Sequence, residues 1–275
     1  MSLSIRANTP STLDLTIVVP LKDEAGNLEC LAREIALALE ATTYSWECVW
    51  VDDGSRDGSP AELRRLAAAD ARHRVLTLDR NHGQSAALAT GFAHARGRLF
   101  ATLDADGQSD PADLPRLADQ LLANGLDLVN GWRVHRHDSR IRKLSSRVAN
   151  DFRNRLTDDA VHDVGCAVRV MRREVVDGIP LFHGAHRFLP TLVRMNGFSR
   201  MAEVPVHHRP RGAGISKYGI RNRLWVGIGD TLMIRWLRRR AVAPVTLRVE
   251  AAAPREWTAP ITSTRGWPRA AEVEA

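Results

Sequence analysis

Asp104 and Asp106 stand one residue apart after an apolar run, residues 99–103, that predicts a buried strand. A strand that ends in Asp-x-Asp brings both carboxylates to the edge of a sheet where ligands of α/β proteins bind. Carboxylate oxygens suit Mg²⁺ or Mn²⁺, and such ions usually complete their coordination with substrate phosphates. The motif predicts a divalent ion that bridges the chain to a nucleotide diphosphate. The alternative is that both aspartates only end the strand and cap the next helix.

Two other loops carry carboxylates directly after predicted strands. Asp23 and Glu24 follow one β-branched apolar run, and Asp52 and Asp53 follow the next. In a parallel sheet the carboxyl ends of the strands meet at one edge, so the three acidic loops should lie close together. Their coincidence favours the nucleotide site over the alternative in which Asp-x-Asp is only a strand end.

The elements that must position these loops alternate between strand and helix. This rhythm is typical of βαβ units, and it predicts an α/β fold with a Rossmann-like, mostly parallel sheet flanked by helices. The small side chains between residues 85 and 95 should let that helix approach the sheet closely. The expected strands are 15–20, 46–51, 75–78, 99–103, 126–130, 167–171 and 201–207, and the expected helices include 28–39, 85–95, 111–124, 140–156, 188–195 and 219–240.

Local signals refine these boundaries. Pro20 should end the first strand because proline cannot donate to a ladder, and Pro205 indicates an edge strand for the same reason. Ser59 is predicted as the N-cap of the second helix, with Glu62 as its capping-box partner.

The second half of the chain is rich in arginine. Residues 133–155 carry many more basic than acidic side chains, for which the plain alternative is a solvated helix face. The loop 207–218 is basic and glycine-rich with no acidic residue, so it could surround a phosphate with N–H groups and cationic heads. It could equally be an ordinary surface loop.

The last expected helix, 219–240, is amphipathic. Its apolar stripe consists of Trp225, Ile228, Leu232 and Trp236, and three arginines close it. Tryptophans on the stripe and arginines at the end suit a helix that lies on an anionic membrane. A helix whose stripe packs on the core of the domain fits the pattern equally well.

Composition narrows the function classes. The chain has 275 residues, 44% hydrophobic and 26% charged, with a net charge of +7 that favours an anionic partner. It has no apolar run long enough for a transmembrane helix and no leader-like start, and its three scattered cysteines favour a reduced protein without structural zinc. We expect no nucleic-acid partner, because a recognised motif and interleaved stacking aromatics are lacking. A dinucleotide oxidoreductase is disfavoured because no GxGxxG follows the first strand.

Together the motifs resemble the ordered signature of inverting GT-A glycosyltransferases of family 2. The blocks are Val18-Val19-Pro20 with Glu24, residues 51–58 (VDDGSRDG) and residues 103–108 (LDADGQ). Farther on, residues 131–133, 163–172 and 209–218 resemble the polyprenyl-phosphate branch, which includes dolichol-phosphate mannose synthases and undecaprenyl-phosphate glycosyltransferases. The resemblance runs from about residue 14 to 237. Lys22-Asp23 replaces the aromatic-Asn pair that is common before the glutamate, so the base preference does not carry over.

The resemblance implies a role for each matching position. Pro20, Glu24, Asp52 and Asp53, with Asp104, would bind the nucleotide. Asp104, Asp106 and Gln108 would hold Mg²⁺ or Mn²⁺ on the donor diphosphate. The acceptor or donor phosphates would be bound by Arg133, Arg209, Ser216 and Lys217. Asp163 would assist activation or positioning, and it joins Asp104, Asp106 and Arg133 as a residue expected to take part in catalysis.

The implied reaction is metal-dependent, inverting transfer of a hexose-type sugar from a UDP- or GDP-sugar to a polyprenyl phosphate at the cytoplasmic face of the membrane. The alternative is a family 2 transferase with a saccharide or another soluble acceptor. Because members of the bacterial branch commonly continue into two transmembrane helices, we expect either peripheral membrane contact through 219–240 or a separate membrane subunit. The expected regions are a flexible arm 1–12, a GT-A domain 13–218 with nucleotide half 13–108 and acceptor half 109–218, the helix 219–240 and a disordered tail 241–275.

Overall fold

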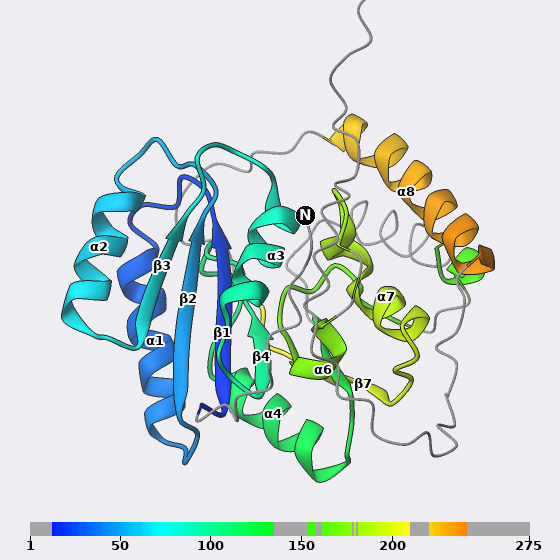
Figure 1. Cartoon of the computed structure of the whole chain (residues 1–275). Coiled ribbons are helices and arrows are strands. Elements are labelled where there is room, and N and C mark those ends of the chain that lie inside the picture. The colour runs from blue at the N-terminus through cyan, green and yellow to red at the C-terminus, as the bar shows by residue number, and fades with distance from the viewer. Residues whose placement is uncertain are drawn as a thin grey trace, which may run out of the picture. The chain divides into compact units, whose positions relative to one another are not determined.

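One seven-stranded sheet, in the order β3-β2-β1-β4-β6-β5-β7, forms the centre of the computed structural model (Figure 1). The structure describes residues 13–134, 153–157, 161–177, 179, 181–209 and 220–240, with the side chains of 220–228 left aside. β1 pairs in parallel with β2 and β4, whereas β6 runs antiparallel to both of its neighbours. The strands are β1 Leu15–Leu21, β2 Trp46–Asp52, β3 His73–Thr77, β4 Leu99–Thr102, β5 Leu128–Trp132, β6 Arg169–Arg172 and β7 Met201–Pro205.

Helices cover both faces of the sheet, which is why every residue of β1, β2 and β4 is buried. One apolar cluster joins the sheet to α1, α2 and α4, and a second joins the opposite face to α3, α6, η1, α7 and α8. The helices are α1 Leu28–Glu40, α2 Ser59–Ala69, α3 Gln84–His94, α4 Asp113–Ala123, α6 Arg173–Val176, the 3-10 helix η1 Ala185–Phe188, α7 Leu189–Met195 and α8 Ile220–Arg240. The predicted α/β fold with a mostly parallel sheet is confirmed.

The small-residue helix α3 lies close against β1, as predicted. A Cβ atom added at Gly91 would stand 2.3 Å from Cγ1 of Val18. Glycine is therefore needed at this crossing, because any side chain there would push α3 away from the sheet. The close packing fixes the start of α3, and thus Gln84, relative to the end of β4.

Two local predictions were wrong. β1 continues through Pro20 to Leu21, which pairs with Asp52, because one missing N–H does not end a ladder. The N-cap of α2 is Gly58 instead of Ser59. The Ser59 hydroxyl accepts the backbone N–H of Glu24 at 2.9 Å, and Glu62 accepts N–H groups at the start of α1. These side chains tie the loop after β1 to the loop after β2.

The later elements match the expected order. β7 is an edge strand, as Pro205 indicated, and α8 covers nearly all of the predicted 219–240. Of the expected helix 140–156, residues 153–156 are helical and the remainder lies outside the described residues, as do the arm 1–12, the tail 241–275, Ser216 and Lys217. Among the helices in the described part of the chain, none is long and apolar enough to cross a bilayer.

Candidate active site

Asp104 and Asp106 follow β4 directly and lie at the carboxyl edge of the sheet. The side-chain amide of Gln84 donates to Oδ1 of Asp104 at 2.8 Å, and Oδ1 of Asp106 accepts the backbone N–H of Gln108 at 3.1 Å. α4 begins only at Asp113, after the N-cap Ala112, so neither aspartate caps it. The alternative in which Asp-x-Asp caps the next helix is therefore wrong.

The environment of Asp104 disfavours its ionised form. Burial raises the pKa of Asp104 to about 6, and the negative charge of Asp106 adds to the shift, while Arg133 and Arg169 oppose it. Within the described ranges no group of three or more His, Cys, Asp and Glu side chains is gathered for a metal. Two carboxylates with a neighbouring amide, Asp104, Asp106 and Gln108, are a donor set that fits a Mg²⁺ or Mn²⁺ ion completed by water and phosphate oxygens.

The loop after β2 meets the loop after β3 through Asp53. Its two carboxylate oxygens accept the backbone N–H groups of His82 at 2.6 Å and Gly83 at 2.8 Å. Asp52 is fully buried, and its Oδ1 accepts the N–H of Ser55 at 2.9 Å. Its Oδ2 is buried with no hydrogen-bond partner in the described structure. A buried acceptor without a donor is an unusual feature.

The loop after β1 completes this edge. Pro20 lies in β1 opposite Val51, and Oε2 of Glu24 accepts the side-chain N–H of Asn27 at 3.0 Å. Lys22 donates to the carbonyl of Gly54 at 3.0 Å, which gives a structural reason for the lysine at this position. The three acidic loops therefore meet at one edge of the sheet, as the sequence predicted.

Arg133 and Asp163, thirty residues apart in the chain, form a buried bidentate pair. Nε of Arg133 donates to Oδ2 of Asp163 at 2.7 Å, and Nη2 donates to Oδ1 at 2.8 Å. Burial alone would lower the pKa of Arg133, but the carboxylate of Asp163 outweighs it and raises that pKa, so the guanidinium is always charged. Because both oxygens of Asp163 are engaged, the geometry favours a positioning role for Asp163 over proton transfer.

A network behind this pair was missed by the sequence reasoning. Arg169 is buried and donates to Oδ1 of Asn130 at 2.8 Å and to the Val164 carbonyl at 2.6 Å. Glu203 accepts the backbone N–H groups of His162 at 2.8 Å and Asp163 at 3.2 Å. These residues come from three strands far apart in the chain, so spacing could not reveal them. Arg169 lies in the block 163–172 that carries the family resemblance, but nothing in the sequence indicated its partners.

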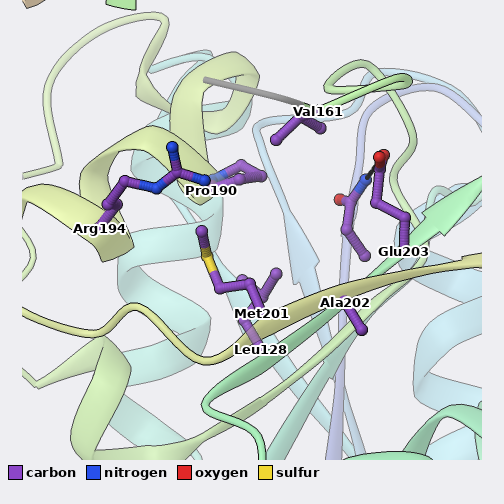
Figure 2. Close-up of a pocket in the computed structure, with 8 residues that line it drawn as sticks. Leu128, Val161, Pro190, Arg194, Met201, Ala202 and Glu203 are labelled. Carbon is purple, nitrogen blue, oxygen red and sulfur yellow. Dashed lines mark hydrogen bonds between the residues drawn. The ribbon is translucent and has the colours of Figure 1, made fainter. Parts of the chain in front are cut away.

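A pocket of about 190 Å³ lies beside this network, between β5, β7 and α7 (Figure 2). Figure 2 shows Arg194 and Pro190 on one side of it and Glu203 on the other. Glu203 also accepts a hydrogen bond from Asn130 at 3.3 Å. The described lining holds none of the predicted site residues, but it includes Asn130 and Glu203 of the network.

The start of the basic loop lies against the Asp-x-Asp-x-Gln segment. The backbone N–H of Arg209 donates to the Gln108 carbonyl at 2.8 Å. His208 and Ser109 form an isolated antiparallel β-bridge. The guanidinium of Arg209 contacts Glu34 at 2.8 Å and Asp110 at 2.6 Å. The structure thus places the backbone of Arg209 beside Gln108. The guanidinium of Arg209, which was predicted to bind phosphate, is paired with the carboxylates of Glu34 and Asp110.

A mostly parallel sheet whose fourth strand is followed by Asp-x-Asp, beside two further acidic loops, is typical of glycosyltransferases of the GT-A class. The chain matches the family Glycosyl transferase family 2 over residues 16–179. Its fold is similar to that of glucosyl-3-phosphoglycerate synthase from Mycobacterium tuberculosis in complex with Mg²⁺ and uridine diphosphate, with a TM-score of 0.61 at 19% identity over 86% of this chain and 82% of that one. The chain belongs to glycosyltransferase family 2.

Its relatives include enzymes named for polyprenyl phosphates. It is 36% identical over 236 residues to dodecaprenyl-phosphate galacturonate synthase of Rhizobium johnstonii, a match that covers 85% of this chain and 70% of the relative. It is 40% identical over 207 residues to undecaprenyl-phosphate 4-deoxy-4-formamido-L-arabinose transferase of Salmonella choleraesuis, covering 74% of this chain and 62% of the relative. The match thus spans less than two thirds of the second relative.

Proposed function

We propose that this glycosyltransferase moves a sugar from a UDP- or GDP-sugar to a polyprenyl phosphate and inverts the anomeric carbon. The observation that carries the proposal is the Asp104–Asp106 pair, whose charge interacts with that of Arg133. Asp163 fixes the orientation of the Arg133 guanidinium. The two aspartates suit a metal-bound diphosphate, and the arginine suits a second phosphate. The polyprenyl phosphates in the names of the two relatives support this acceptor class.

The donor would be held by the three acidic loops. Pro20, Glu24 and Asp53 would lie around the base and ribose, with the buried Asp52 as their neighbour. Asp104 and Asp106, with Gln108 beside them, would hold Mg²⁺ or Mn²⁺, and that ion would supply Lewis-acid stabilisation of the leaving diphosphate. The Gln84 amide orients Asp104 for this task.

The acceptor would be held by cations. A lipid monophosphate is already ionised near neutral pH, so attack on the sugar needs positioning more than a strong base. Arg133 would orient that phosphate, with Ser216 and Lys217 as further phosphate ligands. Arg209 can join them only if its guanidinium exchanges Glu34 or Asp110 for a phosphate oxygen.

The reaction would take place at the cytoplasmic face of the membrane, where a lipid acceptor and a soluble nucleotide sugar can meet. Residues 13–108 would form the nucleotide half and 109–218 the acceptor half. Peripheral contact by the protein itself would bring the site to the lipid, and a separate membrane subunit is the other way to meet this requirement.

An acceptor panel tests the proposal. The protein is incubated with Mg²⁺ or Mn²⁺, radiolabelled UDP- and GDP-sugars, and either a short-chain polyprenyl phosphate or free oligosaccharides. Label should enter the polyprenyl product, and the Asp106→Asn variant should fail to transfer it. Label in oligosaccharides alone would contradict the proposed acceptor and favour the soluble-acceptor alternative.

A further inference from the structure

One distant segment, residues 183–186 at the start of η1, contacts both chain neighbours of Gln84. On one side the imidazole of His183 lies over Gly83, since a Cβ atom added to that glycine would stand 3.0 Å from Cε1 of the ring. On the other side the buried hydroxyl of Ser85 is bonded to the same segment, which lies 99 residues further along the chain. Gln84 is therefore flanked by two contacts with one segment.

The hydroxyl of Ser85 makes three hydrogen bonds to this segment. It accepts the backbone N–H groups of Gly184 and His186, each at 3.2 Å, and it lies 2.8 Å from Nδ1 of His186. A hydroxyl oxygen has two lone pairs, and the two N–H groups fill both, so its own proton is donated to Nδ1. We call these three bonds the Ser85 clasp. The clasp requires both a hydroxyl at position 85 and an acceptor on the side chain at position 186.

The inner side of α8 supports the clasp from behind. Gly184 has a φ of +93°, and a Cβ atom there would stand 2.9 Å from Oδ2 of Asp230, so this position needs glycine. Arg187, directly after the segment, lies 3.8 Å from the same carboxylate. Because α8 packs here with this side, Leu232 and Trp236 of its predicted stripe are 51% and 59% exposed. Of the two alternatives for the stripe, packing of these two residues on the core is therefore wrong.

The start of α3, which the clasp holds, contacts two carboxylates of the candidate site. The backbone N–H of Gly83 donates to Oδ2 of Asp53 at 2.8 Å. The side-chain amide of Gln84 donates to Oδ1 of Asp104 at 2.8 Å. Since Ser85 follows directly in the chain, a shift of this start would move both donors at once.

We propose that Ser85 and His186 are positioning residues of the metal site. The clasp fixes the start of α3, and through Gln84 it fixes the orientation of the Asp104 carboxylate. Contacts that hold a ligand in one orientation strengthen metal binding, because the free site then loses less freedom when the ion arrives. Both residues act through Gln84 rather than on the substrate. This role rests on the proposed function only in that the metal binds at Asp104 and Asp106.

A Mn²⁺ titration of the full chain, followed by tryptophan fluorescence, tests the role of Ser85. Ser85→Ala should lower the apparent affinity for Mn²⁺ about threefold, because the start of α3 loses the bonds that hold it. Thr90→Ala is the matched control. It removes another hydroxyl of α3, one that donates to the carbonyl of Ala86 within the helix, and it should change nothing. Wild-type affinity in Ser85→Ala would overturn the proposal.

A double variant shows whether Ser85 acts through Gln84. If it does, Ser85→Ala has no further effect once Gln84 is replaced, so Gln84→Ala and Gln84→Ala/Ser85→Ala should bind Mn²⁺ equally well. A loss that reaches the metal by another path would lower the affinity by the same factor in both backgrounds. Equal factors in the two backgrounds would therefore overturn the assigned path.

Two substitutions test the side chain of His186. The amide oxygen of asparagine can replace Nδ1 as the acceptor of the Ser85 proton, whereas leucine has no acceptor. His186→Asn should keep the affinity for Mn²⁺ within about twofold of the wild type, and His186→Leu should lower it about threefold, as Ser85→Ala does. The same affinity in both variants would overturn the role of this side chain.

Hydrogen exchange without metal gives a second readout at the start of α3. In Ser85→Ala the N–H of Gly83, which Asp53 accepts, should exchange faster by a larger factor than the N–H of Val18 in the buried strand β1. A general loss of stability would instead speed both by the same factor. Equal factors, or unchanged exchange at Gly83, would contradict the link between the clasp and this start.

The titrations also separate this proposal from the proposed function. A wild-type chain without a Mn²⁺ response, or a response that survives in Asp106→Asn, would contradict the proposed metal site and with it the role of the clasp. A response that Asp106→Asn abolishes and Ser85→Ala leaves unchanged would contradict the role of the clasp alone. We expect a response that Asp106→Asn abolishes and Ser85→Ala weakens.

Discussion

The two sides of the candidate site hold their carboxylates in different ways. On the side of β1, β2 and β3, Asp53 accepts two backbone N–H groups, from His82 and Gly83. On the side of β5, β6 and β7, Asp163 accepts two side-chain N–H groups of Arg133 together with its backbone N–H, so a single charged residue supplies all three. Backbone donors stay in place when a neighbouring side chain is changed, whereas a buried side-chain pair loses its balance of charge when either member is removed.

This difference predicts on which side of the site a substitution can change function without changing the stability of the fold. Substitutions among the acidic loops should alter ligand binding and leave the fold intact. Substitutions in the Arg133–Asp163 network should alter the fold as well, because each member is buried against the next. The predictions below test this contrast, beginning with the largest expected effect.

Asp104→Asn should lower turnover about 10³-fold, since it removes a charged ligand that stabilises the transition state. Its free energy of unfolding without metal at pH 7.5 should stay the same or rise slightly. Burial raises the pKa of Asp104 to about 6, so the ionised carboxylate is unfavourable in the fold at that pH. Steady-state kinetics and urea unfolding check both parts. A less stable variant would contradict the separation.

Asp163→Asn should lower the free energy of unfolding by about 3 kcal/mol, because it leaves the Arg133 cation buried without its counter-charge. Urea unfolding followed by circular dichroism measures this. Glu40→Gln, which breaks an exposed pair with Arg72, is the control and should cost no more than about 1 kcal/mol. If both variants lost the same free energy of unfolding, the Arg133–Asp163 pair would be no more important for stability than an exposed ion pair.

Acid should weaken the β3 side through His73. Burial lowers the pKa of His73 below its usual value, and its Nδ1 accepts the indole N–H of Trp50 at 3.2 Å. The unfolded chain therefore takes up the proton first, and stability falls as pH drops below about 6.5. Between pH 7.5 and 5.5 the wild type should lose more stability in urea unfolding than His73→Gln, a comparison in which the opposite contribution of Asp104 is the same for both proteins. The same loss in His73→Gln would assign it to other groups.

Gln84→Ala should have the smallest effect. It removes one hydrogen bond to Asp104 and leaves the carboxylate in place, so the apparent affinity for Mn²⁺ should fall less than about tenfold. Titration with Mn²⁺ followed by the protein's tryptophan fluorescence measures it. Gln120→Ala, on an exposed position of α4, should change nothing. A change as large as that in Asp104→Asn would mean that Gln84 is itself a ligand.

The acidic side of the site could be predicted from the sequence because its signals are local. Each carboxylate follows its own strand within three residues, and the parallel order of the strands then gathers Glu24, Asp53 and Asp104 at one edge. The end of β1 and the cap of α2 were wrong for the opposite reason. Ser59 and Glu62 bind a loop distant in sequence, and no pattern around α2 reports that contact.

The basic side could be predicted only in part. Arg133 and Asp163 were found by motif, but their pairing and the support from Arg169 and Glu203 arise from an antiparallel strand inserted between β4 and β5. The stripe on α8 was found from its periodicity, whereas its outward direction depends on backbone carbonyls at Leu156 and Thr157. Periodicity shows which residues share a face of a helix, but it does not show whether that face is buried or exposed.

The central claim is that Asp104 and Asp106 hold the divalent ion that binds the nucleotide diphosphate. Thermal unfolding with UDP and GDP, with and without Mn²⁺, tests it most directly. The account predicts that one nucleotide raises the Tm only when Mn²⁺ is present, and that Asp106→Asn abolishes this rise. An equal rise in the variant, or a full rise without any divalent ion, would contradict it.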